Sequence, residues 1–170
     1  DFEGEFDVIF SNAALHWVID HQPVLSGIRR SLKPGGRILL QMGGRGNASN
    51  VVGVLGDIFG RKEWNRYFTD FTLPYGFYGP EEYEEWLQEA GFTPTRVELV
   101  PKDMVHEGRE GLAGWIRTTW LPFTQRIPEE LREQFIDELV SGYVRHYPPD
   151  DNGLVHVNAI RLEVEAEYIP

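Results

Sequence analysis

The first residues able to do chemistry follow an apolar run near the start of the chain. Asp7 to Phe10 is typical of a strand buried on both faces of a parallel sheet. It is followed by small and polar residues and then by two larger rings: Ser11, Asn12, Ala13, Ala14, His16 and Trp17. An imidazole can take up a proton near neutral pH, and small side chains let a ligand approach the backbone. Ligands of open α/β sheets bind at the carboxyl ends of strands, so this segment is a candidate site.

Other interpretations of this segment stay open. Residues 11–14 are also compatible with a plain strand-to-helix turn, and Trp17 is compatible with the core. His16 is compatible with a structural or solvated position, because a single histidine is a thin basis for catalysis.

A second group of such side chains lies far along the chain. Trp115, Arg117 and Trp120 place a guanidinium between two indoles, a composition able to close over an organic acid and grip its carboxylate bidentately. A helix that buries its indoles and exposes Arg117 explains the same pattern equally well. Tyr78, which follows Tyr75 and Phe77, could line the same cavity or simply pack beneath it.

Metal chemistry is not predicted. His106, His146 and His156 show no metal-ligand spacing, and the chain has no cysteine. The acidic residues that follow Pro80 are typical of a solvated helix face.

The pattern around these residues predicts alternating strands and helices. Apolar spacing predicts a helix over 23–32, ended by Lys33-Pro34-Gly35-Gly36, and a second strand over 37–42. Strand, helix and strand in this order indicate a parallel crossover. A further helix is predicted over 48–59.

The second half continues with more helix than strand. We predict a helix from Pro80 to Ala90 with Gly91 as a left-handed cap, then a strand over 96–100. Helices over 108–120 and 128–147 form an insertion. The last run, 156–168, alternates glutamates with apolar residues, the period of a half-solvated strand.

Bulk composition narrows the function. At 170 residues the chain is the size of one domain, and its net charge of −11 leaves no broad basic surface for nucleic acid. The absence of cysteine fits a reducing cytoplasm, and no apolar run is long enough for a membrane span. The chain starts with Asp1 rather than Met, and a strand follows within a few residues, which we interpret as a cut.

Three motifs together resemble the class I S-adenosylmethionine-dependent methyltransferases, in the branch that includes trans-aconitate methyltransferase. They are Phe6 to Trp17 (FDVIFSNAALHW), Leu32 to Arg37 (LKPGGR) and Glu89 to Phe92 (EAGF). The resemblance implies an α/β fold with a truncated Rossmann-like sheet, in which parallel strands are joined by an antiparallel last strand. It also implies that 1–170 is the C-terminal part of one methyltransferase domain, with 108–147 as a helical substrate flap.

The same resemblance implies the cofactor S-adenosylmethionine, a small-molecule methyl acceptor such as a carboxylate, and roles for the residues above. The cofactor side comprises Ser11, Asn12, Ala13, Ala14 and Trp17. The substrate side comprises Tyr78, Trp115, Arg117 and Trp120, and His16 is the first candidate base for a hydroxyl acceptor. The family's glycine-rich cofactor loop would lie upstream of Asp1, so this chain alone is expected to be inactive.

Two rival interpretations remain at this point. The chain could be a non-catalytic methyltransferase-like fragment or interaction module that does not bind the cofactor, and its exposed sheet could then pair with itself. A nucleotide-binding oxidoreductase is disfavoured because no dinucleotide fingerprint follows a first strand.

Overall fold

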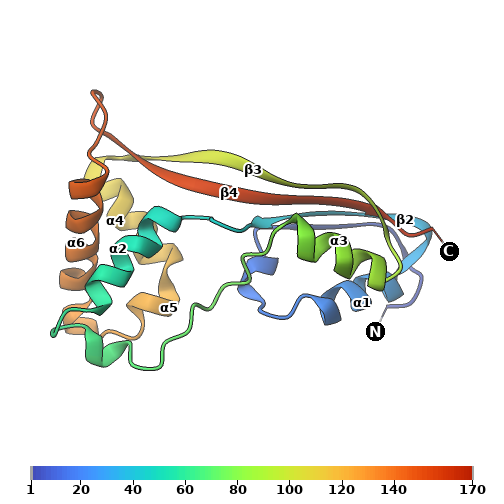
Figure 1. Ribbon diagram of the computed structural model, residues 1–170, viewed down its shortest axis with the longest axis horizontal. Helices are drawn as coiled ribbons and strands as arrows, with labels where there is room; N and C mark the ends of the chain where they lie inside the picture. Colours follow the sequence, from blue (N-terminus) through green and yellow to red (C-terminus); the bar gives the residue numbers. More distant parts are fainter. Residues whose placement is uncertain (1, 170) are drawn as a thin grey trace. The chain divides into compact units, whose positions relative to one another are not determined.

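The computed structural model describes residues 2–169 (Figure 1). The predicted domain limits, Asp1 and Pro170, lie outside the described residues. The chain divides into two compact units. Unit 1 comprises 2–47, 74–102 and 160–169, and unit 2 comprises 48–73 and 103–159. The insertion predicted over 108–147 lies within unit 2.

Unit 1 begins with the predicted parallel crossover. β1 (Phe6–Asn12) is followed by α1 (Gln22–Ser31) and β2 (Leu32–Gly43), and β1 pairs in parallel with β2. The register shifts between Phe6 and Val8, where the Lys33-Pro34-Gly35-Gly36 segment enters. Gly35 has a φ of 81°, a conformation that glycine adopts without strain. The segment expected only to end the helix is therefore also an irregular start of β2.

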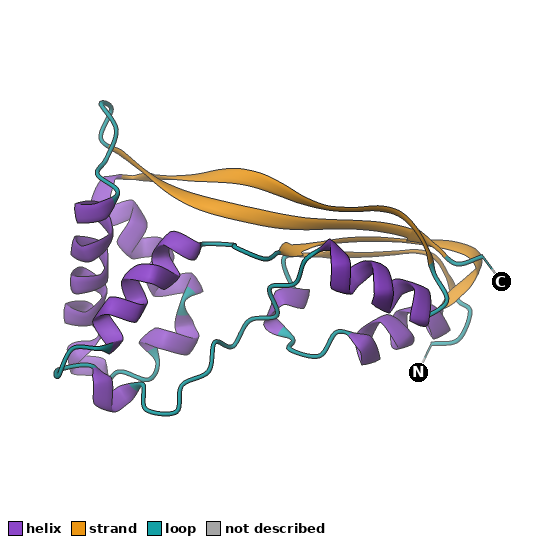
Figure 2. Ribbon diagram, in the orientation of Figure 1, coloured by secondary structure: helices purple, strands orange, loops and turns teal. Residues whose placement is uncertain are grey.

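The remaining strands complete a four-stranded sheet in the order β1-β2-β4-β3 (Figure 2). β3 runs from Thr93 to Glu107, and β4 (Leu154–Glu167) pairs antiparallel with β2. The antiparallel last strand expected from the resemblance is confirmed. β3 is longer than the predicted strand over 96–100, which it contains.

The core of unit 1 lies between one face of the sheet and two helices, α1 and α3 (Pro80–Glu89), which cover that face (Figure 1). Buried side chains alternate along the strands that contribute to it: Ile38, Leu40, Met42, Leu162, Val164 and Ala166. The helix predicted from Pro80 is confirmed, and Gly91 has the predicted left-handed conformation, with a φ of 83°.

The prediction that β1 is covered on both faces is wrong. Val8 is 55% exposed and Phe10 is 61% exposed, because α1 and α3 lie on the other face of the sheet. On this uncovered face the glutamates of β4 are half-buried, and two of them are paired with Arg96: its guanidinium lies 2.6 Å from Glu163 and 3.3 Å from Glu165. Gln41 also donates to Glu163 at 3.0 Å. This part of the sheet is thus lined by polar groups.

Unit 2 is mainly helical. It contains α2 (Ser49–Phe59), η2 (Asn65–Tyr67), α4 (Gly108–Thr119), α5 (Leu121–Thr124) and α6 (Glu129–His146). α2 and α4 pack against α6 around an aromatic core that includes Trp64, Phe123, Phe135 and Tyr143. Three of these helices were predicted and are confirmed, whereas the short α5 was not predicted.

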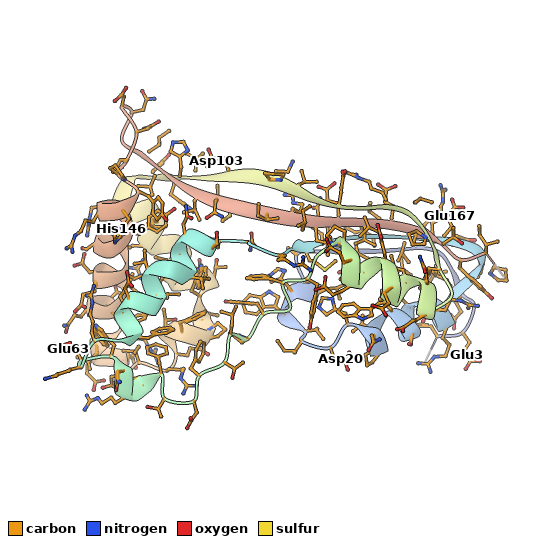
Figure 3. All side chains as sticks on the ribbon, in the orientation of Figure 1. Glu3, Asp20, Glu63, Asp103, His146 and Glu167 are labelled. Atoms are coloured by element: carbon orange, nitrogen blue, oxygen red, sulfur yellow. The ribbon has the colours of Figure 1, made fainter. Side chains whose placement is uncertain are left out.

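Acidic side chains are spread over the surface of both units. Glu3 and Asp20 in unit 1 and Glu63 in unit 2 are exposed (Figure 3). No helix among residues 2–169 has both the length and the apolar character that a bilayer crossing requires.

Candidate functional site

The candidate site begins where β1 ends. Ala13 has a φ of 54°, and its N–H donates to the Gln41 carbonyl on β2 at 2.8 Å. This left-handed residue turns the chain sharply into η1 (Leu15–Trp17), where the buried Leu15 anchors the turn. Ser11 is half-buried, whereas Asn12, Ala13 and Ala14 are exposed. The turn therefore presents small side chains and backbone at the carboxyl end of β1.

His16 is held by backbone groups from two other segments. Its Nδ1 accepts a hydrogen bond from the Gly43 N–H at 3.3 Å, and its carbonyl accepts one from the Gly76 N–H at 2.9 Å. A backbone N–H can only donate, so Nδ1 carries no proton and the neutral ring is protonated at Nε2. Burial lowers the pKa of His16, and the neighbouring His21 lowers it further. The ring is therefore neutral near pH 7, and its Nε2–H is a hydrogen-bond donor.

Three aromatic rings gather beside His16, and we call Trp17, Tyr75 and Phe77 the ring cluster. The His16 ring centroid lies 5.5 Å from Trp17 and 6.0 Å from Phe77. Tyr75 stacks on Phe77 with centroids 5.0 Å apart, and it meets Trp17 edge-on at 5.1 Å. A Cβ at Gly43 would lie 2.8 Å from Phe77, so a glycine lets this ring approach β2.

A buried histidine supports the far side of the same turn. His21 is fully buried, its Nε2–H donates to the Val18 carbonyl at 2.9 Å, and the Tyr83 hydroxyl donates to its Nδ1 at 2.5 Å. Burial lowers the pKa of His21 and raises that of Tyr83. This pair fixes the backbone just after Trp17. Sequence reasoning missed it, because the polar neighbours of His21 suggest an exposed loop.

Tyr78 lies with this buried pair rather than with the ring cluster. Its hydroxyl donates to the Ile19 carbonyl, and its ring meets His21 at 4.9 Å and Trp86 at 4.7 Å. The predicted substrate residue Tyr78 therefore packs beneath the segment that carries Trp17. Its neighbours Tyr75 and Phe77 instead contact His16.

The glycine-rich segment after β2 forms a turn. A Cβ at Gly44 would lie 2.6 Å from Leu99, so the backbone packs directly against β3. Arg45 is exposed and forms ion pairs with Glu81 at 3.1 Å and Glu82 at 2.6 Å, near the start of α3. Its charge is thus already matched by carboxylates.

The predicted substrate residues of the insertion lie in unit 2. Trp120 is buried, with its ring centroid 5.5 Å from Trp115 and 5.1 Å from Phe123. Arg117 donates two hydrogen bonds to the Glu133 carboxylate, at 2.9 and 2.7 Å. This ion pair lowers the pKa of Glu133. The Arg117 guanidinium is therefore already engaged in the bidentate contact that a substrate carboxylate would need.

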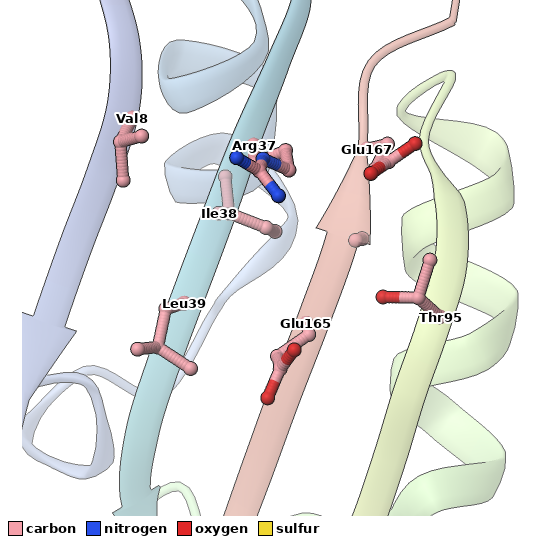
Figure 4. A pocket seen from close by; sticks show the side chains of 8 residues that line it. Val8, Arg37, Ile38, Leu39, Thr95, Glu165 and Glu167 are labelled. Carbon is pink, nitrogen blue, oxygen red and sulfur yellow. The ribbon is translucent and has the colours of Figure 1, made fainter.

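The uncovered face of the unit 1 sheet carries a hollow of about 380 Å³ (Figure 4). Its labelled side chains come from all four strands: Val8, Arg37, Ile38, Leu39, Thr95, Glu165 and Glu167. None of the predicted site residues lines it. Within residues 2–169, no cluster of three or more histidine, aspartate and glutamate side chains is arranged to hold a metal ion.

Sequence comparison relates this chain to methyltransferases. Residues 2–40 match the family model described as a methyltransferase domain. Juvenile hormone acid O-methyltransferase of Drosophila melanogaster is 31% identical over 147 residues, which cover 82% of this chain and 48% of the relative. Trans-aconitate 2-methyltransferase of Methylobacterium nodulans is 29% identical over 162 residues, covering 92% of this chain and 60% of the relative. The chain also matches a third curated relative, of which it covers 39%. It therefore spans about two fifths to three fifths of the length of these three relatives.

Solved structures show the same fold. A candidate methyltransferase of Bacillus halodurans superposes with a TM-score of 0.58 at 15% identity, covering all of this chain and 67% of that protein. The YcgJ protein of Bacillus subtilis gives a TM-score of 0.54 at 14% identity, with the same coverage of both chains. The α/β Rossmann-like fold predicted from the sequence is thus confirmed.

Proposed function

We propose that this chain, a relative of the class I S-adenosylmethionine-dependent methyltransferases, forms the methyl-acceptor side of an enzyme that methylates a small organic acid. The observation that carries this proposal is the turn at the carboxyl end of β1. There, small exposed residues lie beside a neutral histidine and the ring cluster.

The proposed cofactor side is the turn itself, comprising Ser11, Asn12, Ala13, Ala14 and Trp17. The Asn12 amide makes no side-chain hydrogen bond to the described part of the chain and is exposed, so it is available to a polar group. Ala13 and Ala14 leave the backbone accessible. These features fit the methionine end of S-adenosylmethionine. When bound, that cofactor supplies a methyl group on a sulfonium, ready for direct displacement.

The work left to the chain's own residues is orientation and the exclusion of water. A carboxylate acceptor already carries its nucleophilic electron pair and needs no base. His16 would then donate its Nε2–H to one carboxylate oxygen and so orient the other oxygen for attack on the methyl group. For a hydroxyl acceptor, His16 would have to act as a base, and its Nδ1 lone pair is already used by the Gly43 N–H.

The unit 2 residues Trp115, Arg117 and Trp120, and Tyr78 of unit 1, remain part of the proposal as acceptor-side groups. Arg117 could bind a carboxylate only by leaving Glu133. Glu133→Gln weakens that pair, so it should lower KM for acid acceptors if Arg117 takes part. An unchanged KM would exclude Arg117.

The experiment that tests the function is transfer of isotopically labelled methyl from S-adenosylmethionine by the full-length protein containing this chain. We expect labelled methyl esters among a panel of organic acids, and no transfer to any acid would refute the proposal. Calorimetry with S-adenosylmethionine on residues 1–170 alone would separate an incomplete cofactor site from a complete one. The exposed Val8 and Phe10 also support self-association of the isolated chain, which sedimentation would detect.

His16 variants test its role separately. His16→Asn keeps an acceptor near Nδ1 but loses the donor at Nε2, whereas His16→Gln can place a donor near Nε2. We expect His16→Gln to retain more carboxylate methylation than His16→Asn. With His16 in place, the pH profile of methylation should be flat above pH 6.5, the ordinary pKa of histidine, because the pKa of His16 is lowered from that value. Equal losses in both variants would contradict a donor role.

A further inference from the structure

We propose that the ring cluster binds the apolar body of a carboxylic acid that carries a single carboxylate. The inference rests on the proposed methyl transfer and names its acceptor class. It would place an apolar chain against Trp17, Tyr75 and Phe77, and the carboxylate at the Nε2–H of His16.

The first support is a run of exposed apolar side chains that begins with Trp17 of the cluster. Trp17, Val18 and Ile19 follow one another and are 44%, 37% and 54% exposed. Three consecutive exposed apolar side chains are unusual on a soluble surface unless they meet a ligand or partner. The Tyr78 hydroxyl and the His21 ring hold the backbone of Ile19 and Val18 from beneath, so these side chains are displayed on a fixed support.

The second support is charge. Burial lowers the pKa of His16, so the ring beside the cluster is uncharged near neutral pH. Arg45, two residues beyond the Gly43 that contacts Phe77, is paired with Glu81 and Glu82. A second carboxylate pressed against the aromatic rings would lose hydration, and the cluster contains no cationic side chain to replace it. A second carboxylate on the acceptor would therefore be disfavoured here.

The third support is the single, well-oriented donor. The Gly43 N–H fixes the tautomer of His16 through Nδ1, which leaves one N–H for the ligand. One such donor suits one carboxylate oxygen and leaves the other oxygen to react. In the methyl transfer, that oxygen forms a bond to the methyl carbon while the carbon–sulfur bond breaks, and the sulfur keeps the bonding pair.

The test compares decanoic acid with decanedioic acid in the full-length protein, because the two differ only in a second carboxylate. We expect kcat/KM for decanoic acid to exceed that for decanedioic acid about tenfold or more. Phe77→Leu and Trp17→Leu should each lower kcat/KM for decanoic acid about threefold to tenfold, as loss of one aromatic contact predicts. Tyr147→Leu, at a similarly exposed ring of unit 2 that packs near Tyr143 and His146, is the matched control and should leave kcat/KM unchanged.

Binding is measured separately, so that the two proposals can fail independently. Decanoic acid is titrated calorimetrically in the presence of S-adenosylhomocysteine, with the fold of each variant checked by circular dichroism. Binding that Phe77→Leu weakens, without any methyl transfer, would uphold the ring cluster and refute the proposed activity. Equal use of both acids, or transfer that neither leucine variant affects, would overturn the inference.

Discussion

Ala13 provides a test of how the candidate site is built. Its φ of 54° is left-handed, its side chain is exposed, and its N–H is tied to Gln41. An alanine in this conformation costs roughly 1–2 kcal/mol in crowding between Cβ and the backbone. Ala13→Gly removes that cost but gives the unfolded chain freedom worth about 0.4–1 kcal/mol. We therefore expect a net stabilisation of about 0.5–1 kcal/mol.

The control is the neighbouring residue. Ala14 is also exposed, but its φ is −116°, so glycine relieves nothing there and Ala14→Gly should not stabilise the protein. Ala13→Val should destabilise it, because a β-branched side chain tolerates positive φ poorly. Urea unfolding of the protein containing this chain measures all three variants. Equal effects of glycine at both positions would refute the left-handed turn.

Two further predictions concern histidines. Tyr83→Phe removes the hydroxyl that bonds the buried His21, and this should lower the free energy of unfolding in urea by about 1–3 kcal/mol. The control Tyr67→Phe, at a less buried site, should change that free energy by no more than about 0.5 kcal/mol. Similar losses in both would contradict the buried pair. Hydrogen bonds to Asp103 and, to a smaller extent, Asp150 raise the pKa of His156 above 6.5. These bonds to the protonated ring therefore stabilise the folded protein fully below pH 6.5, and this stabilisation is lost as the pH rises through the raised pKa. His156→Gln should remove the part of the pH dependence that lies above about pH 6.5, and an unchanged profile would contradict it.

Local signals were enough to predict most elements. Pro80 and Gly91 bracket α3 because a proline fits a first helical turn and a glycine fits the left-handed cap. The strand predicted to stop at Val100 continues instead through Pro101 to Glu107. A proline lacks the N–H that an internal strand needs, but β3 is the last strand of its sheet, where an edge position tolerates it.

The supports of the site could not be predicted, because they join segments far apart in sequence. His21 looks solvated among Asp20 and Gln22, and only the fold brings Tyr83 to its Nδ1. The extended segment that carries Tyr75 and Phe77 sends both rings to His16, whereas Tyr78 turns to the opposite support. Side-chain type alone does not distinguish these three aromatic residues.

The contacts that hold the turn in place are different from the rings that are proposed to bind an acceptor. Three backbone contacts hold residues 13–18: the Ala13 N–H to Gln41, the His16 carbonyl to Gly76, and the Val18 carbonyl to His21. None of them uses a ring of the cluster. Substitutions at Trp17, Tyr75 or Phe77 can therefore change the surface offered to an acceptor while the turn keeps its place. By the same reasoning, loss of His21 should impair every acceptor equally, whereas loss of Phe77 should change the preference among them.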